Sequence, residues 1–137
     1  MKQKGALALL RAASRGSIGV AAGPQGPDPL LERGRQLHRS GRLDEAEALY
    51  RKVLAFNPGS VAANAALAEL LLQRGNYPAA IACLDLCVAA APKNAEYLNN
   101  LGYAHILNNT QEFGLPHLLK AAKLDPKNWR ILANVGR

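Results

Sequence analysis

Apolar residues recur three and four positions apart over about 13 residues in successive segments of the chain, with short polar turns between them. A second apolar segment follows each turn and ends near a proline, which cannot continue a helix. The pattern therefore predicts pairs of helices and no large sheet. The turns are Ser40-Gly41, Gly75-Asn76 and Asn108-Asn109, and the prolines are Pro58, Pro92 and Pro126.

This pattern repeats every 34 residues without a gap, so residues 27–60, 61–94 and 95–128 align and residues 129–137 begin a fourth unit. When the units are aligned, small residues recur at the same positions, or columns, where two helices would cross closely. Such a register predicts a repeat architecture. The small columns are Gly34, Ala68, Gly102 and Gly136; Ala46, Ala80 and Gly114; and Val53, Cys87 and Ala121. The large apolar columns include Leu67, Leu101 and Val135, and Tyr50, Leu84 and Leu118.

The third unit departs from the pattern in two places. Asn109 stands where the turns of the first two units have Gly41 and Gly75. Pro116 falls inside the second helix, next to the flexible residue Gly114. We therefore expect a kink and the least regular helix pair here, unless the helix starts late.

Three segments resemble the tetratricopeptide repeat (TPR) family: GRLDEAEALYRKVLAFNP, GNYPAAIACLDLCVAAAP and NTQEFGLPHLLKAAKLDP. The resemblance covers roughly residues 27–137. It implies an all-α fold, an α-solenoid of antiparallel helix pairs in a right-handed superhelix. It also implies that the first helix of each pair lines a concave groove, in which TPR domains bind peptides or partner proteins.

The family pattern implies which residues face this groove. The N-terminal end is basic and the C-terminal end is apolar with amides, which suits an extended peptide or a helix with some acidic character. Alternatively, the arginines are solvated and Leu72 and Ile106 are half-buried. The expected partner-binding residues are Arg35, His38, Arg39, Glu69, Leu72, Gln73, Asn99, Asn100, Tyr103, Ile106 and Asn134.

Two TPR subclasses can be compared by residue. Chaperone-binding members have a carboxylate clamp, and of its positions only Asn100 agrees, so capture of a chaperone C-terminus is not expected. The clamp positions here are Leu31, Arg35, Ala66, Glu96 and Asn100. Other members have a ladder of asparagines that bonds a ligand backbone, which Asn-Leu-Gly at 100–102 and Asn-Val-Gly at 134–136 resemble. The alternative is that these asparagines bond to neighbouring helices.

The segment NWRILANVGR matches only the start of a fourth unit. A terminal cap carries a polar outer face, whereas Trp129, Leu132 and Val135 would leave this end apolar. We expect either that Arg137 is a truncation point or that this end associates with a second copy.

The charge is concentrated at the N-terminus. The net charge is +7, and residues 1–27 contribute +4 through Lys2, Lys4, Arg11 and Arg15, with no acidic residue. We expect residues 1–27 to be an uncleaved flexible tail and linker, with a secretory signal or a mitochondrial transit peptide as alternatives. The TPR domain would occupy residues 28–137, starting with Asp28 as a helix cap and Pro29 in the first turn.

The composition narrows the class of protein. Hydrophobic residues make up 49% of the chain, which is enough to bury a core, and no apolar run reaches the roughly 20 residues of a membrane span. A cytoplasmic location is favoured, with a mitochondrial or envelope-associated one as the alternative.

Catalytic and metal-binding patterns are not found. Cys87 falls in a small packing column and is expected to be buried and inert. His38, His105 and His117 are scattered, and a packing role is expected for His105. No nucleophile elbow, zinc-protease or phosphate-loop pattern occurs. We therefore expect no enzyme activity, no metal and no cofactor.

The leading interpretation is a non-catalytic TPR adaptor that assembles other proteins. It is similar to TPR components of bacterial pilus-assembly and secretion systems, such as the TadD-type tight-adherence proteins. One alternative is the recognition arm of an enzyme such as a glycosyltransferase. Another is weak RNA binding through the tail and Arg33, Arg35, Arg39 and Arg42, but interleaved aromatic residues are missing, so nucleic acid is not the expected partner.

Overall fold

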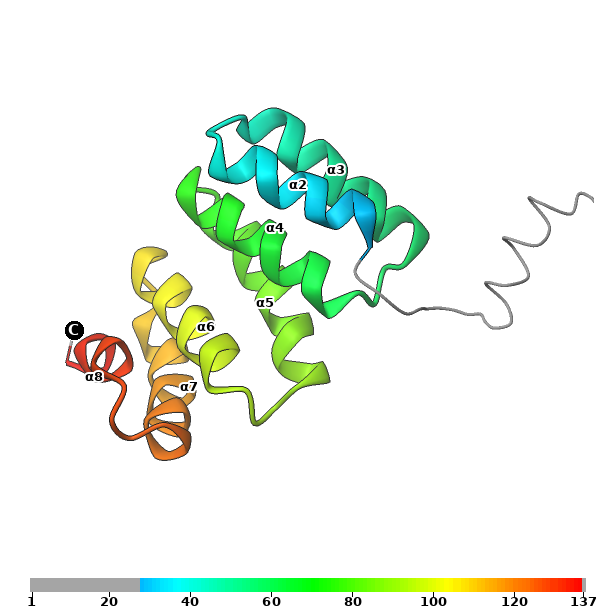
Figure 1. The fold of residues 1–137 in the computed structure, drawn as a ribbon. Helices are drawn as coiled ribbons and strands as arrows, with labels where there is room; N and C mark the ends of the chain where they lie inside the picture. Colours follow the sequence, from blue (N-terminus) through cyan, green and yellow to red (C-terminus); the bar gives the residue numbers. More distant parts are fainter. Residues whose placement is uncertain (1–27, 137) are drawn as a thin grey trace, which may run out of the picture. The chain divides into compact units, whose positions relative to one another are not determined.

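Helices account for nearly all of the part of the chain that the structure, a computed structural model, describes, namely residues 28–136. This part contains no strand, so the predicted all-α fold is confirmed. The predicted tail, residues 1–27, lies outside the described residues. The helices are α2 (Pro29–Arg39), α3 (Leu43–Phe56), α4 (Val61–Gln73), α5 (Tyr77–Ala90), α6 (Ala95–Leu107), α7 (Gln111–Leu124) and α8 (Trp129–Val135) (Figure 1).

The chain divides into two units, Met1–Glu32 and Arg33–Arg137. In the first unit the structure describes residues 28–32, where α2 begins. Asp28 Oδ1 accepts the backbone N–H of Leu30 at 2.8 Å and that of Leu31 at 3.4 Å, and Pro29 is the first residue of the helix. The predicted cap and first-turn proline are confirmed. Asp28 accepts N–H groups that have no partner within the helix, and Pro29 has no N–H group that would need one.

In the second unit, consecutive helices from α3 to α8 pack against one another, and α6 also contacts α8. The same turn joins the two helices of each pair. Its central residue has a positive φ, which is 82° at Gly41, 81° at Gly75 and 61° at Asn109. The next residue donates its N–H to a carbonyl five positions back. These bonds run from Arg42 to Leu37, from Asn76 to Leu71 and from Thr110 to His105.

Asn109 thus adopts the left-handed conformation that glycine adopts in the other two turns. Asparagine tolerates this region, whereas a Cβ-bearing residue without a short polar side chain is strained there. We expect Asn109→Ala to lower the free energy of unfolding by about 1 kcal/mol, and Asn109→Gly to leave it unchanged or raise it. Urea unfolding of the three proteins checks this, and an alanine variant as stable as the wild type would contradict it.

The repeat columns meet inside the helix pairs. Tyr50, Leu84 and Leu118 are all buried. Gly34, Gly102 and Gly114 of the small columns lie where helices approach closely, whereas Gly136 has ordinary space around it. A Cβ added to Gly34 would lie 2.7 Å from Tyr50 Cε1, and one added to Gly102 would lie 2.6 Å from Leu118 Cδ2. The predicted close crossings are therefore confirmed, since these positions have no room for a methyl group.

Pro116 lies inside the second helix of the third pair, as the sequence predicts. α7 runs through Pro116 and has 14 residues, as do α3 and α5. Its first turn is tighter, because Phe113 N–H donates to the Thr110 carbonyl three positions back, whereas the α3 and α5 turns have bonds four positions back. The first turn of α7 therefore differs from those of α3 and α5, and the expected kink at Pro116 stays a prediction.

Candidate functional site

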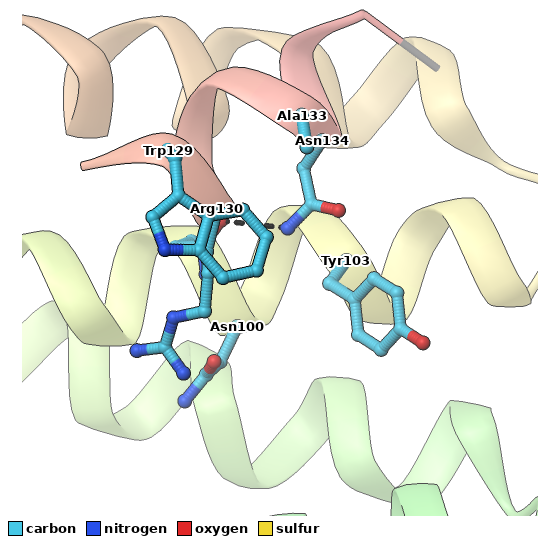
Figure 2. A pocket seen from close by; sticks show the side chains of 7 residues that line it. Asn100, Tyr103, Trp129, Arg130, Ala133 and Asn134 are labelled. Atoms are coloured by element: carbon cyan, nitrogen blue, oxygen red, sulfur yellow. Dashed lines mark hydrogen bonds between the residues drawn. The ribbon is translucent and has the colours of Figure 1, made fainter. Parts of the chain in front are cut away.

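A pocket of about 290 Å³ lies between α6 and α8 (Figure 2). On each helix an adjacent pair of lining residues is followed by further lining residues three or four positions along, which places them on one face. Asn94 and Asn128 begin the two helices in the same register, each by accepting a backbone N–H with its side chain. The lining residues are Asn99, Asn100 and Tyr103 from α6, and Trp129, Arg130, Ala133 and Asn134 from α8.

Two of the asparagines are bonded to each other at the base of the pocket. Asn134 Nδ2 donates to Asn99 Oδ1 at 2.9 Å, and each residue is only 8% exposed. Figure 2 shows the Asn134 oxygen pointing away from this bond. An amide group offers two donors and an acceptor, so this single bond leaves capacity on both residues.

The asparagines were interpreted either as ligand-binding groups or as groups that bond neighbouring helices, and the structure distinguishes these roles for some of them. Asn134 and Asn99 follow the alternative, because they bond across neighbouring helices. Asn100 lies in the same pocket, is half-buried, and has no side-chain hydrogen bond within the part of the chain that the structure describes. Asn100 is therefore the predicted site residue whose amide is most available to a ligand.

Among residues 28–136, Arg130 is the only charged one that lines the pocket. It is exposed and forms no ion pair or hydrogen bond through its side chain with any of residues 28–136. By contrast, Arg42 pairs with Glu45, Arg51 with Glu47 and Arg74 with Asp44. Arg42 was one of the arginines considered for RNA, and its pairing with Glu45 reduces its availability for phosphate.

Sequence reasoning missed Arg130 and assigned Trp129 only to the apolar end. The 34-residue register contains a signal that could have identified Arg130. Position 130 lies 34 residues after Glu96, which stands at one of the clamp positions of the family's groove. Extending the groove positions into the incomplete fourth unit would have found Arg130.

Two other predicted groove residues bond to each other. His38 Nε2 lies 2.7 Å from Gln73 Oε1, and His38 Nδ1 lies 3.2 Å from the Tyr50 hydroxyl. A neutral imidazole with its proton on Nε2 donates to Gln73 and accepts from Tyr50, so both ring nitrogens are satisfied. These contacts join α2, α3 and α4, which gives His38 and Gln73 a structural role.

The remaining predicted residues lie outside the pocket between α6 and α8. Arg35 and Arg39 are on α2, and Glu69 and Leu72 are on α4. Ile106 lines a second cavity, of about 240 Å³, which Asn134 also lines. The other residues of this cavity are Gln111, Glu112, Leu115, Leu118 and Val135.

The C-terminal end has the apolar surface that the sequence predicts. Trp129 is 73% exposed and Leu132 is 48% exposed, whereas Val135 is half-buried. Ile131 holds α8 in place by packing with Leu98 and Ala121. Self-association through this end stays a prediction.

The cysteines are poor nucleophiles. Cys87 is fully buried, and its thiol donates to the Val61 carbonyl at 3.6 Å. Burial, with a smaller contribution from Cys83, raises the pKa of Cys87 to about 11, so the reactive thiolate is rare at neutral pH. Burial also raises the pKa of Cys83. The expectation that Cys87 is buried is confirmed.

His105 lies between α6 and α7, where its ring packs against Phe113 and stacks on His117 at 6.5 Å. Its Nδ1 lies 2.9 Å from Thr110 Oγ1. Burial lowers the pKa of His105 below 6.5; Asp85 and Glu112 oppose the shift, and His117 adds to it. The expected packing role is therefore supported.

This pKa shift predicts a pH dependence of stability. Below pH 6.5 the unfolded chain takes up a proton that folded His105 resists, so stability contributed by His105 is present above that pH and is lost as the pH falls toward the lowered pKa. We expect His105→Asn to lose less stability than the wild type between about pH 7.5 and about pH 5.5. Denaturant unfolding at both pH values measures this, and equal losses in the two proteins would contradict it.

Within residues 28–136, no three side chains of His, Cys, Asp or Glu come together as potential metal ligands. None of the described helices is long and apolar enough to cross a membrane.

Comparison with known proteins agrees with this helical architecture. Two family models, both described as tetratricopeptide repeat, match residues 37–102 and residues 4–61. No curated protein matches the sequence significantly. Among solved structures, MamA from Desulfovibrio magneticus RS-1 is similar with 31% identity and a TM-score of 0.76, over 81% of this chain and 63% of that one. This chain thus spans less than two thirds of the MamA chain.

Two further structures are similar. A mutant O-GlcNAc transferase from Thermobaculum terrenum has 30% identity and a TM-score of 0.70, over 77% of this chain but only 20% of that one. The first TPR domain of Spaghetti (RPAP3), bound to an HSP90 peptide, has 20% identity and a TM-score of 0.74, over 78% of this chain and 85% of that one. At this identity the likeness to Spaghetti shows the fold alone.

The helix pairs share one turn geometry and one 34-residue register, and both matching family models have the same description. TPR modules act in protein–protein interaction and are generally non-catalytic. Tetratricopeptide repeats are thus recognised in this chain, by two models that together span residues 4–102.

Proposed function

We propose that this chain is a non-catalytic adaptor that binds a peptide segment of a partner protein in the pocket between α6 and α8. The observation that supports this most strongly is the pocket itself, where three amide side chains and two aromatic side chains line one cavity of about 290 Å³. Amides donate to and accept from peptide groups, and aromatic rings supply contact area at low entropic cost. The described residues that line this pocket include no nucleophile with an adjacent base.

A structural relative with the same fold is bound to a peptide. The first TPR domain of Spaghetti has a similar fold and is bound to an HSP90 peptide. The chaperone peptide itself is not expected for this chain, because Leu31, Ala66 and Glu96 stand at three of the clamp positions. A role in assembling a larger complex, such as a pilus or secretion apparatus of the TadD type, stays a prediction.

Selection from a displayed library of random linear peptides, with the full chain as bait, tests the proposal. We expect Asn100→Ala to weaken binding of the selected peptides by about tenfold, because it removes an amide that lines the pocket without adding charge. Gln36→Ala is the matched control, since Gln36 is an exposed amide residue on α2. Fluorescence anisotropy measures the affinities.

Equal binding by the two variants would reject the pocket as the binding site. Failure to enrich any peptide above a bait-free selection would reject peptide binding altogether.

A second candidate is the substrate-recognition arm of a glycosyltransferase. It is favoured by the 30% identity to the O-GlcNAc transferase and by the 34-residue spacing of Asn100 and Asn134. Sequencing the gene beyond the codon for Arg137 separates the candidates. A reading frame that continues into a catalytic domain would favour the enzyme arm, and neighbouring pilus or secretion genes after a stop codon would favour the adaptor.

A further inference from the structure

We propose that the pocket between α6 and α8 selects an extended segment in which an acidic side chain stands beside an apolar one. This inference rests on the proposed peptide binding and names the chemistry of the ligand. Three features of the pocket support it.

The first feature is an uncompensated cation. Arg130 lines the pocket without a carboxylate partner in the part of the chain that the structure describes, and no acidic residue lines the pocket with it. A guanidinium group forms paired hydrogen bonds with a carboxylate, and such charge-assisted bonds are stronger than neutral ones. Asn100, on the facing helix, can add a neutral N–H donor to the same group.

The second feature favours an extended backbone over a helix. Asn99 and Asn134 are each more than nine-tenths buried, line the pocket, and share only one hydrogen bond with each other. Their remaining donor and acceptor groups match the N–H and C=O of a peptide unit. A helical ligand has already used these groups internally, whereas an extended segment presents them.

The third feature is the aromatic wall. Trp129 is 73% exposed and lines the pocket together with Tyr103. Figure 2 shows Trp129 and Arg130 extending from the start of α8 toward α6, so an apolar side chain on Trp129 would place its neighbour close to the guanidinium. The volume of about 290 Å³ is near the lower limit of roughly 300 Å³ for ligand pockets, which suits a short stretch of chain.

The test repeats the displayed-peptide selection with the wild-type chain, Arg130→Gln, Arg130→Glu and a control, Lys120→Gln. Lys120 is an exposed cation on α7 that does not line the pocket. We expect wild type and Lys120→Gln to enrich peptides with Asp or Glu next to an apolar residue. Arg130→Gln should lose this enrichment, and Arg130→Glu should enrich Lys or Arg instead.

Affinities provide a second measurement. A selected acidic peptide should bind at least about tenfold more tightly than its version with Glu replaced by Gln, and this ratio should fall to about one in Arg130→Gln. The preference of the wild type should also weaken with added salt. Circular dichroism confirms that the variants fold.

The outcomes separate this inference from the proposed function. Enrichment of peptides that depend on Asn100 but carry no acidic residue would overturn the inference and leave peptide binding in place. Acidic selection that persists in Arg130→Glu would also overturn it. No enrichment by the wild-type chain would reject the proposed function and the inference together.

Discussion

Replacing Gly114 with alanine is expected to lower the free energy of unfolding by about 2 kcal/mol. A Cβ at this position would lie 2.8 Å from the Gly102 carbonyl oxygen and 2.8 Å from His105 Cβ. The carbonyl is backbone and cannot rotate away, so α6 and α7 must move apart. This cost exceeds the gain of up to about 1 kcal/mol that alanine brings to a helix interior.

The repeat itself makes this result informative. The same column holds Ala46 and Ala80 in the first two units, and both are buried, so a methyl group fits at those crossings. The cost at Gly114 is therefore a property of the α6–α7 crossing. Gly136→Ala is the control, because a Cβ there would have only ordinary contacts, the nearest at 3.7 Å. Urea unfolding in which the two variants are equally stable would show that the crossing can relax.

Replacing Asn134 with alanine is expected to destabilise the chain by about 2 kcal/mol, because it leaves buried Asn99 without its partner. The double variant should lose less stability than the sum of the two single variants, because it leaves no buried amide without a partner. A double-mutant cycle with Asn99→Ala, Asn134→Ala and the double variant measures this coupling by denaturant unfolding.

Asn100→Ala is the matched control for this cycle. Asn100 lines the same pocket without a side-chain hydrogen bond among the described residues, so its loss should change stability by no more than about 0.5 kcal/mol. Additive effects of the Asn99 and Asn134 changes would contradict a structural pair and would favour a role for both amides in ligand binding alone.

Local rules made much of the fold predictable from the sequence. The positive-φ position follows from Gly41 and Gly75, and asparagine is the residue that most readily replaces glycine there, which places Asn109 in the same turn. The buried columns follow from the spacing of apolar residues along each helix. These features depend on residues a few positions apart, so a single chain reveals them.

The site was predictable only in part. The family pattern selected Asn99, Asn100, Tyr103 and Asn134, which the structure brings together in one pocket. It also selected His38 and Gln73, which bond to each other instead. It missed Arg130, because the groove positions were not extended into the incomplete fourth unit.

The sequence by itself thus determined the helices, their turns, the repeat register and the residue type at each groove position, because these depend on spacing along the chain. The tertiary structure alone decided which side chains meet. The Asn99–Asn134 bond, the approach of Gly114 to the Gly102 carbonyl, and the meeting of Arg130 and Asn100 in one pocket depend on how α6, α7 and α8 pack. Helix packing sets distances between residues far apart in sequence to within a fraction of an ångström, and no local pattern specifies such distances.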